Sequence, residues 1–190
     1  NNVEGLPRGL QFWRMSTCWI GGIGVVMFAL VILPSIGKSK MMLSHFELSS
    51  LAKDNFNLYR TPTIVRIVLS VYVGMTVVTT LLLKLCGMSW FDSVCHAMSA
   101  CGTCGFGTKN LSIAWFDSVW IEIVLMAAMA TSGIHFGLIF ATLTRQKNNI
   151  FKSEITRTYF SIIGIAALLI AVSLWVGDIY PTLFESLRKA

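Results

Sequence analysis

Charged residues are scarce in this sequence of 190 residues. Only 13% of them are Asp, Glu, Lys or Arg, while 55% are hydrophobic. An average soluble domain has about 25% charged residues, so this scarcity excludes an ordinary soluble domain and indicates a membrane protein. The uncharged runs are long enough to cross a bilayer, which takes roughly 20 residues. We expect spans at residues 15–37, 67–83, 123–144 and 158–177.

Features of several other protein classes are also missing. The first apolar run lacks a basic leader and a small-residue cleavage site, so a secretory signal does not explain it. The five cysteines are an odd number scattered over apolar segments, which excludes a secreted disulfide framework. The net charge of +6 comes from basic residues interleaved with the spans, and no nucleic-acid motif accompanies it. We therefore expect a lipid bilayer as the partner, and no nucleic acid.

The basic residues are concentrated in two of the connections between spans. Loops 38–62 and 145–156 carry several lysines and arginines, whereas residues 86–110 carry only Lys109. By the positive-inside rule, both basic loops are cytoplasmic and residues 86–110 face outward in a multi-pass plasma (inner) membrane protein. An aromatic belt at the predicted outer ends agrees with this orientation. Its members are Trp13, Trp90, Trp115, Trp120 and Trp175.

Residues 90–101 form an apolar segment that is too short to span. They would make about three helical turns, and both neighbouring spans end on the outer side. The segment must therefore enter the membrane and return, or lie in the interface. Irregular backbone at membrane depth is tolerated only where it is buried in protein or lines a water-filled cavity. Gly102, Gly105 and Gly107 follow the segment at once, so we expect the chain to turn back there.

A re-entrant helix followed by a glycine-bearing loop is the construction of a cation filter. Backbone carbonyls replace the hydration shell of the ion, and positive φ at glycine aims successive carbonyls the same way. The partially negative C-terminal end of the short helix would favour a dehydrated cation. The alternative is a membrane thiol-disulfide oxidoreductase using Cys101 and Cys104, but reactive thiols favour a helix N-terminus and these two follow the helix. Gly105 as a plain turn glycine in a pore-less scaffold is a third interpretation.

A second copy of the short segment indicates an internal repeat. Residues 91–94, Phe-Asp-Ser-Val, are echoed by residues 184–187, Phe-Glu-Ser-Leu, and each copy follows an apolar span. We therefore expect an all-α membrane protein with one complete unit of span, pore helix, filter and span, flanked by two partial units. The closing helix of a first repeat is predicted at 1–37, and the opening span and start of the pore helix of a third repeat at 157–190. The complete second repeat lies between them at 63–144, with a span at 63–85, a pore helix at 89–101, a filter at 102–106 and a span at 114–144. Cytoplasmic loops at 38–62 and 145–156 connect the three repeats.

The order of these segments resembles the potassium-uptake subunits of the Trk/Ktr/HKT family. Between residues 6 and 34, the segments LPR, FWR, WIGGIG and ILP are similar to the exit helix of the family's first repeat. Within residues 90–108, WFDS with His96 and Ser99 and then GFGT resemble the second pore loop. Residues 132–136, SGIHF, are similar to the middle of the next helix. The resemblance covers nearly the whole chain and is firmer to the TrkH branch than to the KtrB branch.

The resemblance implies four repeats around one potassium pathway, each supplying a filter strand with one key glycine. Here that glycine is Gly105, with the carbonyls of Gly102, Thr103 and Cys104 beside it and potassium at residues 103–105. Potassium is the substrate; no covalent cofactor and no enzymatic activity are implied. The sequence of this one filter loop does not distinguish a potassium pathway from a sodium pathway. The resemblance also implies a homodimer gated by TrkA/KtrA-like cytoplasmic nucleotide-binding subunits. The other three filter loops are missing, so we expect a partial subunit that does not conduct by itself.

Three further residues are assigned structural roles. Asp92, near the start of the short helix, complements its dipole and caps its N-terminus together with Ser89. Ser99 is placed with Asp92 as a support of the pore helix. His135 is either an ion or proton relay or a neutral packing histidine, and the lack of a nearby acid favours packing. Arg14, near an outer end, is explained by snorkelling.

Overall fold

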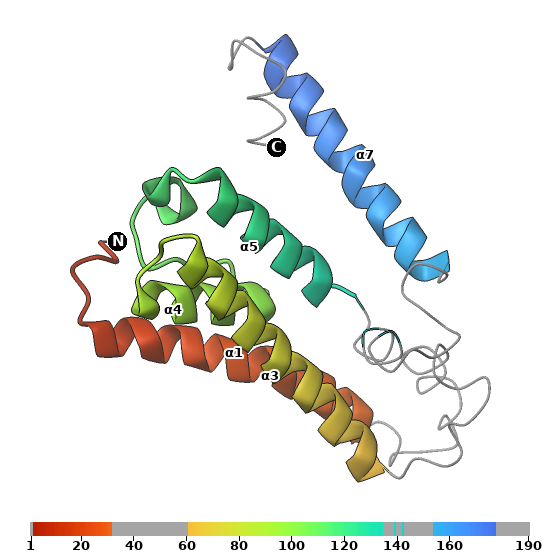
Figure 1. The fold of residues 1–190 in the computed structure, drawn as a ribbon. Helices are drawn as coiled ribbons and strands as arrows, with labels where there is room; N and C mark the ends of the chain where they lie inside the picture. Colours follow the sequence, from red (N-terminus) through yellow and green to blue (C-terminus); the bar gives the residue numbers. More distant parts are fainter. Residues whose placement is uncertain (1, 32–60, 135–138, 140–141, 143–153, 178–190) are drawn as a thin grey trace. The chain divides into compact units, whose positions relative to one another are not determined.

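The computed structural model describes residues 2–31, 61–134, 139, 142 and 154–177. The chain divides into two units, Asn1–Gln146 and Lys147–Ala190. Every element assigned in the described ranges is a helix, which confirms the predicted all-α class (Figure 1). Several predicted features lie outside the described residues. They are the end of the first helix at 32–37, most of both cytoplasmic loops, His135, and the third-repeat pore helix with its repeat motif at 184–187.

Two long helices, α1 (Arg8–Val31) and α3 (Thr61–Leu85), frame the first unit and run in opposite directions (Figure 1). α1 begins directly after Pro7, whose carbonyl accepts hydrogen bonds from the N–H groups of Leu10 and Gln11. At 1.5 Å per residue each helix is about 36 Å long, which exceeds a hydrocarbon core of about 30 Å. α3 is followed by Gly87, whose φ of +98° favours glycine and ends the helix.

The short helix α4 (Trp90–Cys101) lies between α1, α3 and α5 (Val119–Ser132) (Figure 1). Eight of its residues are buried. Three clusters of apolar side chains enclose it, so it satisfies the requirement that a re-entrant segment be buried in protein. They are Leu83, Met88, Ala97, Ala100, Ile121, Leu125 and Ala128; Met15, Cys95 and Met98; and Ile23, Tyr72 and Cys101.

The span expected at 114–144 does not begin as one continuous helix. A 3-10 helix, η4 (Ser112–Phe116), comes first and ends where Asp117 takes a φ of +39°. Ser118 then has extended backbone, and α5 runs from Val119 for 14 residues to a C-cap at Gly133. Asp117 ends the 3-10 helix, because an L-residue in the left-handed region cannot continue a right-handed helix. The described part of this span therefore starts five residues later than expected.

Two helices among the described residues are long and apolar enough to cross a membrane. These are Val65–Leu85, within α3, and Thr156–Val176, within α7 (Glu154–Val176), with mean hydropathies of 1.9 and 2.3. Most residues of each span are not buried, and large apolar side chains such as Val77 in the first and Ile165 in the second are exposed. Such exposed apolar faces suit lipid or a neighbouring helix better than water.

Candidate functional site

The start of α4 is fixed by the cap expected from the sequence. The Ser89 hydroxyl oxygen accepts a hydrogen bond from the Asp92 N–H at 3.1 Å and donates one to Asp92 Oδ2 at 2.7 Å. Ser89 and Asp92 thus provide hydrogen-bond partners for each other. The Asp92 carboxylate also lies at the positive end of the helix dipole. The predicted capping role of Ser89 and Asp92 is confirmed.

At its other end, α4 holds the loop that follows it through backbone N–H groups. The N–H groups of Gly102, Thr103 and Cys104 donate to the last carbonyls of α4 at 2.9, 3.3 and 2.9 Å. The Phe106 N–H donates to the Ser99 hydroxyl at 2.9 Å. The N–H side of the loop therefore faces the helix. The carbonyl oxygens of residues 102–105 accept no hydrogen bond from any residue that the structure describes.

The loop backbone occupies conformations that most residues avoid. Gly102 has a φ of −79°, whereas Thr103 has +53° and Gly105 has +71°. A β-branched residue such as Thr103 is rarely found at positive φ, and such strain costs about 1–3 kcal/mol. A Cβ on Gly105 would meet no atom within 4 Å among the residues that the structure describes. Strained backbone concentrates at functional sites, and this loop has two left-handed residues in three positions.

A second link ties the end of the loop to the start of α4. The Thr108 hydroxyl, 3% exposed, donates to Asp92 Oδ1 at 2.6 Å. One Asp92 carboxylate oxygen thus holds the helix start and the other holds the returning chain. The sequence analysis missed this role of Thr108. The usable signal was Asp92 itself, because a carboxylate on a buried segment needs more than one hydrogen-bond partner.

Behind the loop, Gly107 and His96 are packed closely. A Cβ on Gly107 would lie 3.2 Å from Ser112 Oγ and 3.6 Å from His96 Nε2. His96 Nδ1 bonds the Asp92 carbonyl at 2.9 Å, which makes Nδ1 the donor. The imidazole also packs edge-on against Phe116, with ring centroids 5.5 Å apart. A side chain at Gly107 would therefore press on Ser112, a close approach that was not predicted from the sequence.

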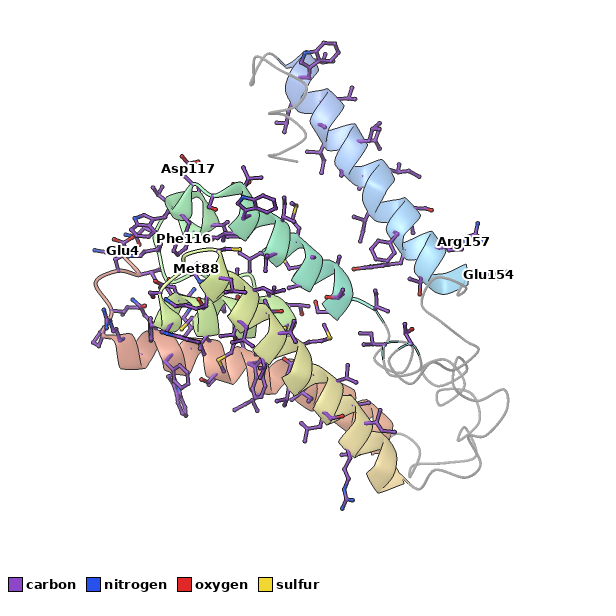
Figure 2. The ribbon with its side chains drawn as sticks, in the orientation of Figure 1. Glu4, Met88, Phe116, Asp117, Glu154 and Arg157 are labelled. Atoms are coloured by element: carbon purple, nitrogen blue, oxygen red, sulfur yellow. The ribbon has the colours of Figure 1, made fainter. Side chains whose placement is uncertain are left out.

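Helix α1 and the segment before it also contact the loop and the chain that follows it. The Arg14 guanidinium carbon lies 4.0 Å from the centroid of the Phe106 ring, so Arg14 stacks on the loop rather than only snorkelling as expected. Asn110 bonds the N-terminal segment through Val3 N–H at 2.8 Å and Asn2 Oδ1 at 2.9 Å. Its own N–H donates to Glu4 at 3.2 Å. Figure 2 shows Glu4, Met88, Phe116 and Asp117 gathered at this end of the unit.

The two cysteines proposed for redox chemistry lie in unfavourable surroundings. Cys101 is the last residue of α4 and only 4% exposed, so it faces the wrong end of the helix dipole for a reactive thiolate. Cys104 lies in the loop after α4, so it too lacks the helix N-terminus that stabilises a thiolate. The oxidoreductase interpretation has no support in this geometry.

The other site residues predicted from the sequence come together in one place. Gly102, Thr103, Cys104 and Gly105 form the loop, and Ser99 and Asp92 bond Phe106 and Thr108, which follow it. His135 lies outside the described residues, so its relay and packing interpretations stay predictions. The arrangement presents carbonyl oxygens that no described residue bonds, on a strained loop backed by a buried helix whose C-terminal end points to it. Such an arrangement can bind a dehydrated cation.

Comparison with known proteins gives one consistent result. Residues 1–174 match the TrkH family model, which is described as a cation transport protein. The Trk system potassium uptake protein TrkH of Halomonas elongata is 33% identical over 99% of this chain, and that of Salmonella typhimurium is 29% identical over 99%. The chain spans 39% of the length of each of these relatives.

A solved structure shows the same fold. The crystal structure of the potassium transporter TrkH from Vibrio parahaemolyticus matches with a TM-score of 0.79 and 23% sequence identity. The match covers 98% of this chain and 37% of that one. The arrangement of α1, α3, α4 and α5 is therefore one that a membrane transporter also adopts.

Proposed function

This chain belongs to the TrkH family of cation transport proteins, and on that premise we propose that residues 102–105 form one wall of a potassium uptake pathway. The observation that carries the proposal is the orientation of the loop backbone. Its N–H groups donate to α4, while the carbonyl oxygens of residues 102–105 accept no hydrogen bond within the described part of the chain. Carbonyl oxygens in this state can replace the water shell of a cation.

Potassium is proposed to contact the carbonyl oxygens of Thr103, Cys104 and Gly105, with the Gly102 carbonyl beside them. Thr103 and Cys104 act through their backbone, so their side chains are not selective elements. Asp92 and Ser99 support the loop without touching the ion, since they bond Thr108 and Phe106 just after it. The C-terminal end of α4 contributes a partial negative charge toward the ion.

The other walls of the pathway are proposed to belong to other repeats. One pore loop encloses only one side of a channel, and the relatives named above are more than twice as long as this chain. We assign residues 63–144 to a complete second repeat, residues 1–37 to the end of the first and residues 157–190 to the start of a third. The loops at 38–62 and 145–156 are their cytoplasmic connections. The chain alone is not expected to conduct.

The family and its apolar helices make this a membrane protein. We propose an inner-membrane location with the loop facing outward, because the basic residues gather in loops 38–62 and 145–156. Exposed Trp13 and Trp90, at the ends of α1 and α4, suit the outer interface. A homodimer with nucleotide-binding regulatory subunits is proposed from the family resemblance, and several relatives are named as parts of a Trk system.

Replacing Cys101 and Cys104 with serine tests the proposal against redox chemistry. The complete transporter is produced in a strain that lacks its own potassium uptake. We expect wild-type and double-variant proteins alike to restore growth at limiting potassium, because backbone oxygens contact the ion. Growth and tracer uptake are measured at equal membrane abundance. Failure of the wild-type protein to restore uptake contradicts the transport proposal. Loss of uptake in the single variant Cys104→Ser supports a thiol function instead.

A further inference from the structure

The backbone of α1 touches the first residue of the proposed filter. A Cβ built on Gly22 would lie 3.1 Å from Gly102 Cα and 3.2 Å from the Gly102 carbonyl oxygen. Conversely, a Cβ on Gly102 would lie 3.2 Å from Trp19 Cα. The backbones of two segments some eighty residues apart are thus in close contact, and a Cβ at either glycine would require the other segment to shift.

The atoms around Gly22 have little freedom to move away. The Tyr72 hydroxyl, also 3.1 Å from the Gly22 Cβ position, donates to the Trp19 carbonyl at 2.9 Å. The Trp19 indole N–H donates to the Thr76 hydroxyl at 3.0 Å, and that hydroxyl donates to the Tyr72 carbonyl at 3.0 Å. This closed set of hydrogen bonds fixes α1 against α3 at the level of the loop. Tyr72 is 2% exposed and has no open side.

Gly102 is equally constrained on its own side. Its N–H donates to the Met98 carbonyl at 2.9 Å, and the next two N–H groups are bonded to α4 as well. A methyl group at position 22 therefore has to displace either the α1–α3 contact or the Gly102 peptide. The carbonyl of that peptide is the first of the set proposed to face potassium.

The three glycines of this α1 segment do not share one role. Gly21 and Gly24 have no atom within 4 Å of their Cβ positions in the described part of the chain, so a methyl group fits there. Alanine also has a higher helix propensity than glycine. Substitution at 21 or 24 should thus favour the helix, and only substitution at 22 acts on the loop.

We propose that Gly22 is a positioning residue for ion selection, which sets the place of the Gly102 carbonyl through direct backbone contact. The proposal rests on the transport function proposed above. In this proposal α1, which is assigned to the preceding repeat, limits how far the filter of the second repeat can move toward it. Arg14 stacked on Phe106 and the bonds from the N-terminal segment to Asn110 hold the far side of the loop in the same way.

The test compares Gly22→Ala with the matched controls Gly21→Ala and Gly24→Ala in the complete transporter. Potassium and sodium uptake are measured at equal membrane abundance. We expect Gly22→Ala to lower the ratio of potassium to sodium uptake several-fold, while both controls keep the wild-type ratio. A ratio in Gly22→Ala equal to that in Gly21→Ala overturns the inference. So does equal impairment of all three variants.

A second variant covers the case in which Gly22→Ala does not reach the membrane. Adding Tyr72→Phe removes one of the crowding oxygens but keeps the conflict with Gly102. An altered ion ratio in this double variant supports the inference, whereas a wild-type ratio or continued absence from the membrane overturns it. The outcomes differ from a failure of the transport proposal, in which the wild-type protein itself takes up no potassium.

Discussion

Replacing Gly105 with aspartate is expected to abolish selective potassium uptake by the complete transporter. Gly105 has a φ of +71°, a region that costs an L-residue about 1–2 kcal/mol. Its Cβ position faces open space, so the carboxylate would not clash but would stand beside the carbonyls of residues 103–105. A fixed negative charge there holds a cation instead of passing it. We expect uptake to fall at least about tenfold, the equivalent of 1.4 kcal/mol, when measured at equal membrane abundance.

Gly87 provides a matched control for this change. It has a φ of +98° and nothing within 4 Å of its Cβ position, yet it lies between α3 and α4, away from the loop carbonyls. Gly87→Asp therefore imposes similar backbone strain without placing charge at the filter, and we expect uptake to persist. Gly105→Ser should be intermediate, since it carries the strain without the charge. A harmless Gly105→Asp would defeat the assignment of the pathway to this loop.

The features that the sequence predicted well are those with local causes. The length of α4 and its Ser89 and Asp92 cap follow from residues within one or two turns of each other. The positive φ of Gly105 follows from the permissive backbone of glycine. The scarcity of charge, which is a property of composition alone, was enough to indicate a membrane protein.

The features that the sequence missed depend on tertiary contact. Thr108 meets Asp92 only because the loop returns past the start of α4, and Arg14 meets Phe106 only because α1 packs against that loop. Gly22 is one of three glycines within four positions of α1, and only the structure separates it from Gly21. No periodicity or local propensity records which backbone segments come within contact distance.

The interruption before α5 had a local signal of a different kind. Asp117 and Ser118 follow Phe116, and such residues favour turns and helix starts over helix interiors. The long apolar run after them outweighed this signal in the prediction of one span from 114. Hydrophobic length indicates that a segment can cross a membrane, but capping residues decide where its helix begins.

Thr108→Val is expected to destabilise the transporter and to weaken ion discrimination. Valine keeps nearly the same shape but removes the hydroxyl that donates to Asp92 Oδ1 at 2.6 Å. A hydrogen bond to a charged group contributes about 1.5–3 kcal/mol, and Thr108 is buried, so water does not replace it. The chain at Thr108 then loses its bond to α4, while the Phe106 N–H keeps its bond to Ser99. We expect a lower melting temperature for the purified protein and a reduced ratio of potassium to sodium uptake.

Three further variants show whether the hydrogen bond itself is responsible. Thr108→Ser keeps the hydroxyl and should restore both the melting temperature and the uptake ratio. Thr131→Val is the matched control, because the exposed Thr131 hydroxyl bonds only carbonyls of its own helix, at 2.8 and 3.0 Å. In Asp92→Ala the carboxylate is absent, so adding Thr108→Val should cost about 1 kcal/mol less than in the wild-type background. Equal effects of Thr108→Val in both backgrounds would show that Asp92 and Thr108 act independently and that this link does not position the loop.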